Sequence, residues 1–413
     1  MSWIKLLIGL GFLFFQIVFL STMPEDEVGS SAMVFVFLYQ IVFVFCLFLI
    51  WKGKYLSVAI TLLLLLFLNL FTAQEFLQSD YKTLPPNMYE RVRIVGDVMP
   101  GFDGVNTIST DSRGFRVTKE VNYDVDAPIR VYAIGGSTTE EINSDDGETW
   151  PALLEDKLTQ EFGQDVEVIN TGLSGLRAKN HLATLLRTEN LYPDYYVFLV
   201  GVNDWNKQIR EITQAIQPKK YDLRDTVLYR AAQILQAIFL QSSHVSTSED
   251  IVSVVELHGE YFSKQNDSLS RADVRSVTVD EVDDDYFNAM KKIAARCNSG
   301  AYKCMFISQP SAYSHKITDN LKARLWMTPT NVGSFTLDLE SMIQISSFYN
   351  EWLHTFSHEN GISFCDLAAT QIEPSEKFFY DDVHFNESGS AFVAEEVFKC
   401  FKTQFETKDT AKK

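Results

Sequence analysis

The stretch RVYAIGGSTTE, residues 130–140, joins an apolar run of strand-forming residues to two glycines and a serine. A buried strand that ends in a tight glycine turn presents the next side chain at the edge of a sheet. Ser137 holds that position, so its hydroxyl is a candidate nucleophile. Serine also caps helices by accepting backbone N–H bonds, which leaves a purely structural role open at the same position. The rest of the chain has to decide between the two roles.

Short apolar runs alternate with amphipathic helices after this stretch. Trp150, Leu154 and Leu158, for example, recur at helical spacing between the first two runs. Alternation on this period predicts right-handed βαβ units and therefore a parallel sheet. The strands that we expect are Val131–Ile134, Val166–Ile169, Tyr195–Val200, Cys304–Ser308 and Ile362–Cys365.

Polar or glycine residues follow the first three of these strands. The carboxyl ends of parallel strands share one edge of the sheet, where ligands bind. Ser137, Gly175 and Asn203 are therefore expected to lie close together, although they are far apart in the sequence.

A base for the serine is available in the sequence DDVH, residues 381–384, just before the last expected helix, 386–401. His384 can face Ser137 while a carboxylate fixes its tautomer and stabilises the imidazolium. The spacing of three residues favours Asp381 over Asp382 for that carboxylate.

Taken together, these motifs resemble the SGNH (GDSL-like) hydrolase superfamily. The match runs from about Asp111 to the last helix through DSRGFR, GGSTTE, INTGLSG, GVND and DDVH, with GGST where the family has GDS. The resemblance implies a flavodoxin-like, three-layer α/β/α domain around a five-stranded parallel sheet. The site residues that it implies are catalytic Ser137, Asp381 and His384, and an oxyanion hole formed by Ser137, Gly175 and Asn203.

The first 75 residues form a different kind of segment. Three nearly uncharged apolar runs, at about 4–20, 33–51 and 55–72, each have the length of a transmembrane helix. Lys5 precedes the first run and Lys52 and Lys54 lie between the second and third, so the positive-inside rule places the N-terminus in the cytoplasm and the remainder outside. The first run also resembles a signal peptide, but no small-residue cleavage site follows it.

We therefore expect four regions: a membrane domain over 1–75, a connector over 76–128 that wraps the catalytic domain, the catalytic domain over 129–405, and a polar tail over 406–413. An insertion at about 206–285 interrupts the catalytic domain. It contains an amphipathic segment, Thr226–Leu240, which is either a cap over the site or an extra packing helix.

Charge and cysteine usage narrow the class of protein. A formal net charge of -18 excludes a nucleic-acid footprint, because phosphates require a basic surface. Four of the five cysteines lie in the exported part, where disulfides form. The candidate pairs are Cys297 with Cys304 and Cys365 with Cys400, although spacing does not fix connectivity and four buried thiols are the alternative. We expect no metal and no cofactor.

The expected protein is a serine esterase or O-acyltransferase in a bacterial inner membrane, with its catalytic domain in the periplasm. Its partners would be the bilayer and an ester substrate, for which similarity to anchored members of the superfamily suggests an O-acetyl group on an exported or cell-envelope polysaccharide. A lipid or lysophospholipid esterase is the alternative of the same class. A non-catalytic glycan-binding or scaffolding component of a membrane complex is the alternative from another class.

Four further residues are expected to be structural. Asp204 is expected to support the turn after the third strand, and His181 to lie within the body of a helix. Gly172 should allow the turn that places Gly175. Asn386 begins an N-glycosylation sequon beside His384, but a helix-capping role is expected there.

Overall fold

The computed structural model describes the chain over residues 52–53, 80–94, 99–102, 104–125, 129–213, 252–254, 273–325, 335–370 and 372–406. The three expected membrane spans and the segment Thr226–Leu240 lie outside these ranges, so they stay predictions. Within the ranges, no helix combines the length and the apolar character that crossing a membrane requires. The chain divides into two compact units, and every element below lies in the one formed by Tyr81–Ile216 and Asp250–Lys413.

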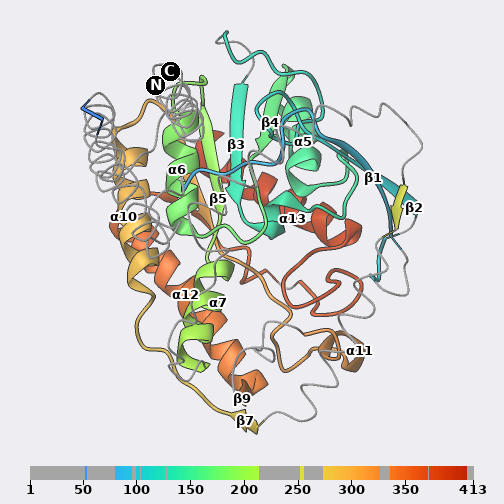
Figure 1. Ribbon diagram of the computed structural model, residues 1–413, viewed down its shortest axis with the longest axis vertical. Helices are drawn as coiled ribbons and strands as arrows, with labels where there is room; N and C mark the ends of the chain where they lie inside the picture. The colour runs from blue at the N-terminus through green and yellow to red at the C-terminus, as the bar shows by residue number, and fades with distance from the viewer. Residues whose placement is uncertain are drawn as a thin grey trace. The chain divides into compact units, whose positions relative to one another are not determined.

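A five-stranded parallel sheet forms the centre of this unit (Figure 1), which confirms the expected α/β class. The strand order is β10-β8-β5-β3-β4, so the first strand along the chain lies between the second and the third. The five strands are β3 (Ile129–Gly135), β4 (Val166–Asn170), β5 (Tyr195–Leu199), β8 (Lys303–Ile307) and β10 (Ser363–Cys365).

Helices cover both faces of the sheet, which explains why its strands are continuous apolar runs rather than alternating ones. On one face, α5 (Trp150–Phe162) packs against α13 (Glu387–Phe401). The other face carries α6 (Ala178–Thr188), α10 (Asp284–Ser299) and α12 (Leu339–Glu359). In β3, every residue from Arg130 to Gly135 is buried, so the strand that precedes Ser137 is fixed on both sides.

Side-chain caps define where several helices begin. Thr149 accepts a hydrogen bond from Ala152 N at the start of α5, and Asp338 accepts one from Ser341 N at the start of α12. These bonds satisfy backbone donors that a helix leaves unpaired in its first turn.

The connector holds strands that the sequence did not predict. β1 (Tyr89–Ile94) pairs antiparallel with β2 (Gly104–Ser109), and β6 (Val252–Val254) joins β1 in parallel. A small apolar cluster joins this sheet to the catalytic domain; it contains Val92, Met99, Phe102, Ile108 and Tyr380. The described part of the insertion contributes α7 (Val202–Thr213) and β7 (Asp273–Arg275), which pairs with β9 (Phe335–Leu337). Two short elements complete the unit, α11 (Asp319–Lys322) and a π-helical turn, η3 (Lys402–Glu406).

Two disulfides join helices to strands of the sheet. Cys297 of α10 is bonded to Cys304 of β8, and Cys365 of β10 is bonded to Cys400 of α13. The second bond closes a loop of 35 residues in sequence separation and ties the edge strand β10 to the last helix.

Candidate active site

Ser137 begins the four-residue helix α4 (Ser137–Glu140) directly after β3. Gly136 is the N-cap of this helix and makes no side-chain capping bond, so the serine hydroxyl does not act as a cap. A Cβ atom on Gly136 would lie 2.6 Å from Asn203 Nδ2, so a larger residue at this point would displace the Asn203 amide. The turn thus leaves the Ser137 hydroxyl at the carboxyl edge of the sheet, between the ends of β3 and β5, where the strand order reverses.

His384 and Asp381 form a hydrogen-bonded series with this hydroxyl. His384 Nε2 lies 2.6 Å from Ser137 Oγ, and His384 Nδ1 lies 2.7 Å from Asp381 Oδ2. Asp381 Oδ1 also accepts the backbone N–H groups of Val383 and His384 at 3.0 and 2.9 Å. The Tyr380 ring stacks on the imidazole with its centroid 5.4 Å away. The carboxylate and the ring therefore fix the imidazole from two directions.

The neighbouring carboxylate, Asp382, has different partners. Its Oδ2 accepts the hydroxyl of Tyr313, and its backbone carbonyl accepts the N–H of Ala312 at 2.7 Å. The geometry therefore places Asp381 behind His384 and leaves Asp382 to hold the segment that follows β8.

Burial and charge act in opposite directions on the two titratable groups of the series. Burial alone would raise the pKa of Asp381, but the charge of His384 and the hydrogen bonds that Asp381 accepts hold it below its ordinary value. Burial alone would lower the pKa of His384, but the charge and hydrogen bond of Asp381 raise it above the ordinary value. The pair thus favours a carboxylate that is ionised and an imidazole that accepts protons readily.

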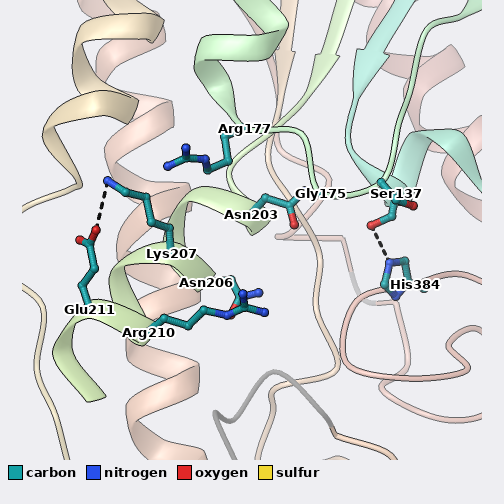
Figure 2. A pocket seen from close by; sticks show the side chains of 10 residues that line it. Ser137, Gly175, Arg177, Asn203, Asn206, Lys207, Arg210, Glu211 and His384 are labelled. Atoms are coloured by element: carbon teal, nitrogen blue, oxygen red, sulfur yellow. Dashed lines mark hydrogen bonds and ion pairs between the residues drawn. The ribbon is translucent and has the colours of Figure 1, made fainter. Parts of the chain in front are cut away.

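Gly175 and Asn203, the other two predicted residues, line the same pocket as Ser137 and His384 (Figure 2). Gly175 has a φ of +78°, a left-handed conformation that favours glycine, in the loop after β4. Asn203 Nδ2 donates to the carbonyl of Leu176 at 2.8 Å. An amide nitrogen carries two hydrogens, so this bond orients the group and leaves a second N–H for a ligand.

The pocket has a volume of about 600 Å³, and polar residues or glycine form its described lining. Figure 2 shows Arg177, Asn206, Lys207 and Arg210 along the wall that leads away from Ser137, with Glu211 in contact with Lys207. Lys207 is also bonded to the carboxylate of Asp283 at 2.6 Å. The sequence motifs did not indicate this wall of the pocket.

The signal that would have found it is the helical period of α7. Starting from Asn203, positions three and four residues apart point to one face of a helix. That face carries Asn206, Lys207, Arg210 and Glu211.

Arg116, from the DSRGFR motif, supports the nucleophile turn from the connector. Its guanidinium is 3% exposed and donates to the carbonyls of Glu140 and Glu141 at 2.7 and 2.8 Å. The same group donates to the carbonyl of Ser144 at 2.9 Å and pairs with Asp146 at 2.8 Å. It therefore satisfies the carbonyls at the end of α4 and fixes the chain that follows.

Three residues for which the sequence suggested a structural role are buried, and two of them accept hydrogen bonds from the backbone of a helix start. Burial lowers the pKa of His181 to about 3, which keeps this histidine neutral inside α6. Burial raises the pKa of Asp204 to about 7, and its carboxylate accepts the Ala178 N–H at the start of α6. Asn386 caps α13 by accepting the Gly389 N–H at 3.1 Å and has no exposed surface, so it is closed to glycosylation.

Across the described ranges, no group of three or more His, Cys, Asp or Glu side chains is arranged to hold a metal ion.

A doubly wound sheet that brings a serine, a histidine and a carboxylate into series at its carboxyl edge is the architecture of an SGNH-type ester hydrolase. The sequence agrees with this class. The chain belongs to the GDSL-like Lipase/Acylhydrolase family, whose model matches residues 133–392. The match confirms the family expected from the motifs and identifies the protein as an ester hydrolase.

Solved structures of low sequence identity resemble the chain. Axe2, an acetylxylan esterase from Geobacillus stearothermophilus, is 13% identical, with 67% of this chain and 93% of that chain covered and a TM-score of 0.35. A GDSL-like lipase from Bacteroides thetaiotaomicron is 14% identical, with 65% and 85% covered and a TM-score of 0.32. An α/β hydrolase from the metagenome of Lake Arreo, LAE5, is 13% identical, with 68% and 97% covered and a TM-score of 0.36. No curated protein matches the chain.

Proposed function

We propose that the protein is a serine esterase or O-acyltransferase in which Ser137 carries the acyl group. The observation that supports this is the series of short hydrogen bonds from Ser137 Oγ through His384 to Asp381, at 2.6 and 2.7 Å, on the wall of an open polar pocket. A serine hydroxyl is a weak nucleophile, and an adjacent base that is oriented by a third group activates it.

In the first step, His384 Nε2 removes the proton from Ser137 Oγ while the oxygen attacks the ester carbonyl carbon. The carbonyl π electrons move to the oxygen, and their return breaks the bond to the alcohol, which leaves with the proton from His384. Water, or a second hydroxyl group, then attacks the acyl-serine by the same route. Asp381 stabilises the imidazolium in each step and is not protonated itself.

The negative oxygen of the tetrahedral intermediate needs donors that are already in place. We assign this role to the backbone N–H groups of Ser137 and Gly175 and to the Asn203 amide, whose free N–H adjoins the serine turn. One such donor contributes about 3 to 4 kcal/mol to transition-state stabilisation.

We propose a short acyl group, acetyl, on a polar acceptor of the polysaccharide class. The pocket supports this choice because its described lining offers hydrogen-bond donors and charges, from Asn206, Lys207 and Arg210, rather than apolar side chains. A long acyl chain would have to leave water for such a surface and gain little from it. The same lining disfavours the lipid or lysophospholipid alternative.

The proposed location is a bacterial inner membrane, with the catalytic domain in the periplasm. The charge distribution around the apolar runs over 4–72 supports this topology. The two disulfides also support it, because disulfides persist in oxidising compartments. A membrane-impermeant thiol or protease probe that reaches the domain only from the cytoplasmic side would refute it.

A fluorophosphonate probe tests the nucleophile directly. We expect the full-length protein to be labelled, Ser137→Ala to take no label, and Ser112→Ala, a change on the exposed surface, to be labelled like the wild type. A folded wild type that takes no label would refute the assignment and favour the non-catalytic alternative.

The acyl preference is tested with 4-nitrophenyl acetate and 4-nitrophenyl decanoate. We expect kcat/KM to be at least about tenfold higher for the acetyl ester, because no apolar side chain is among the described residues that line the pocket. A preference for decanoate would favour the lipid esterase. Release of free acetate, against its transfer to an added oligosaccharide, separates hydrolase from transferase.

A further inference from the structure

One buried carboxylate beside the nucleophile has no part in the steps above. Glu140 ends α4, the helix that begins with Ser137, and its side chain is 2% exposed. Its Oε2 accepts the backbone N–H of Ser174 at 2.7 Å and also accepts the Ser174 hydroxyl. Ser174 directly precedes Gly175, so the carboxylate holds the residue next to a proposed oxyanion donor.

The start of this loop is already bonded to backbone carbonyls of β3 and α4. Asn170 Nδ2 donates to the Thr139 carbonyl at 2.7 Å, and Leu173 N donates to the Gly135 carbonyl at 3.3 Å. Gly172 lies against α4, where a Cβ atom would be 2.7 Å from the carbonyl carbon of Thr139. The loop therefore follows α4 closely as far as Leu173.

The loop becomes exposed at Ser174 and Gly175. At this point the contact to α4 changes from backbone groups to the side chain of Glu140. The Gly175 N–H belongs to the peptide that joins Ser174 to Gly175. Because Glu140 holds the N–H and the hydroxyl of Ser174, the residue that leads into that peptide is fixed in position.

We propose that Glu140 is a positioning residue, which aims the Gly175 N–H at the oxyanion and couples the oxyanion hole to the helix that carries the nucleophile. The inference rests on the proposed function, since it takes Ser137 as the attacking group and Gly175 as a donor. The nucleophile and the donor then move as one unit, because one side chain joins the helix of the first to the loop of the second.

The test measures kcat and KM of the full-length protein for 4-nitrophenyl acetate in three variants. Glu140→Ala removes both bonds to Ser174, and Glu140→Asp shortens the side chain by one methylene. We expect both to lower kcat by about 10- to 100-fold with KM within about threefold of wild type, because a misplaced donor weakens the transition state selectively. Glu140→Gln keeps an oxygen with two lone pairs and should restore kcat to within about threefold of wild type.

Glu141 supplies the matched control. It is the next residue, also buried, and its carboxylate accepts the Trp150 N–H at 2.6 Å and the Ser390 hydroxyl, away from the loop. Glu141→Ala should reduce the free energy of unfolding while the folded enzyme keeps kcat within about threefold of wild type.

Two results would overturn the proposal: Glu140→Asp with the kcat of the wild type, or an equal loss of kcat in Glu140→Ala and Glu141→Ala. If Glu140→Ala does not fold, the comparison of Glu140→Asp with Glu140→Gln decides. Fluorophosphonate labelling of wild type and Ser137→Ala is measured in parallel. A wild type without label refutes the proposed function, whereas normal labelling with unchanged Glu140 variants refutes only the positioning role.

Discussion

Replacing Asp381 by asparagine changes the proton on His384 rather than the shape of the site. Asp381 Oδ1 accepts two backbone N–H groups, and an asparagine oxygen can accept both. The amide NH₂ group would then face His384 Nδ1, where Oδ2 now lies at 2.7 Å. To avoid two opposed donors, the imidazole must carry its proton on Nε2. In that tautomer it donates to Ser137 and cannot remove the serine proton.

We expect Asp381→Asn to lower kcat for 4-nitrophenyl acetate by about 10³- to 10⁴-fold, which corresponds to roughly 4 to 5.5 kcal/mol in the activation free energy. Asp382→Asn is the matched control, because its Oδ2 contacts Tyr313. That variant should lose stability and keep kcat within about fivefold of wild type. Both variants are assayed after circular dichroism has shown that they are folded.

The reasoning fails if Asp381→Asn keeps more than about a tenth of the wild-type kcat, since the tautomer argument predicts a far larger loss. It also fails if the two variants lose the same activity. That outcome would mean that the spacing and the geometry identify the wrong carboxylate.

Three further predictions concern His384, Arg116 and the two disulfides. His384 must be neutral to act as a base, and Asp381 raises its pKa above the ordinary value of 6.5. We therefore expect kcat/KM to fall as the pH decreases, with a midpoint above 6.5. A midpoint below 6 in a pH–rate profile would contradict this. Arg116→Met should reduce the free energy of unfolding by about 3 to 5 kcal/mol in urea titrations, because buried carbonyls and Asp146 lose their donor. The control is Arg113→Met at an exposed position, which should cost less than about 1 kcal/mol. Loss of the disulfide between β10 and α13 should reduce the free energy of unfolding by about 4 kcal/mol, and loss of the disulfide between α10 and β8 by about 2 kcal/mol, because the first closes the longer loop. Variants in which both cysteines of a pair are replaced by serine test this in the same titration. A reversed order would show that chain entropy is not the cause.

The central sheet is the part of the fold that local sequence predicts best. Four of its five strands are short runs that are almost fully buried, so the run of apolar residues in the sequence and the strand in the structure nearly coincide. β3, for instance, is expected over Val131–Ile134 and extends over Ile129–Gly135. Arg130 belongs to this strand although it is charged, because its guanidinium pairs with Glu167 of β4 at 2.7 Å.

Apolar runs in the sequence do not predict the strands of the connector. β1 has the sequence YERVRI, in which three of the six residues are charged, and its first two residues are exposed. Its stability comes from pairing with β2 and from the cluster that includes Tyr380, a residue far away in the sequence. Long-range packing of this kind leaves only a weak local signal.

Some of the polar site residues can likewise be predicted from the sequence, and others cannot. Strand ends and the DDVH motif indicated Ser137, Gly175, Asn203 and His384, because topology alone brings such positions together. The role of Glu140 was not visible, although the residue stood inside the quoted GGSTTE motif. Its function depends on a hydrogen bond across to the loop after β4, and a pattern along one strand does not report on its neighbour.

The bonds of Arg116 also define where a working catalytic fragment has to begin. A fragment that starts at residue 129, where the first strand of the sheet begins, would lack this guanidinium and leave the carbonyls of Glu140, Glu141 and Ser144 without their donor. A fragment that starts at Tyr81, the first residue of the compact unit, would keep it. For protein production, the segment between the apolar N-terminal 75 residues and the sheet is therefore part of the enzyme rather than a tether that can be trimmed.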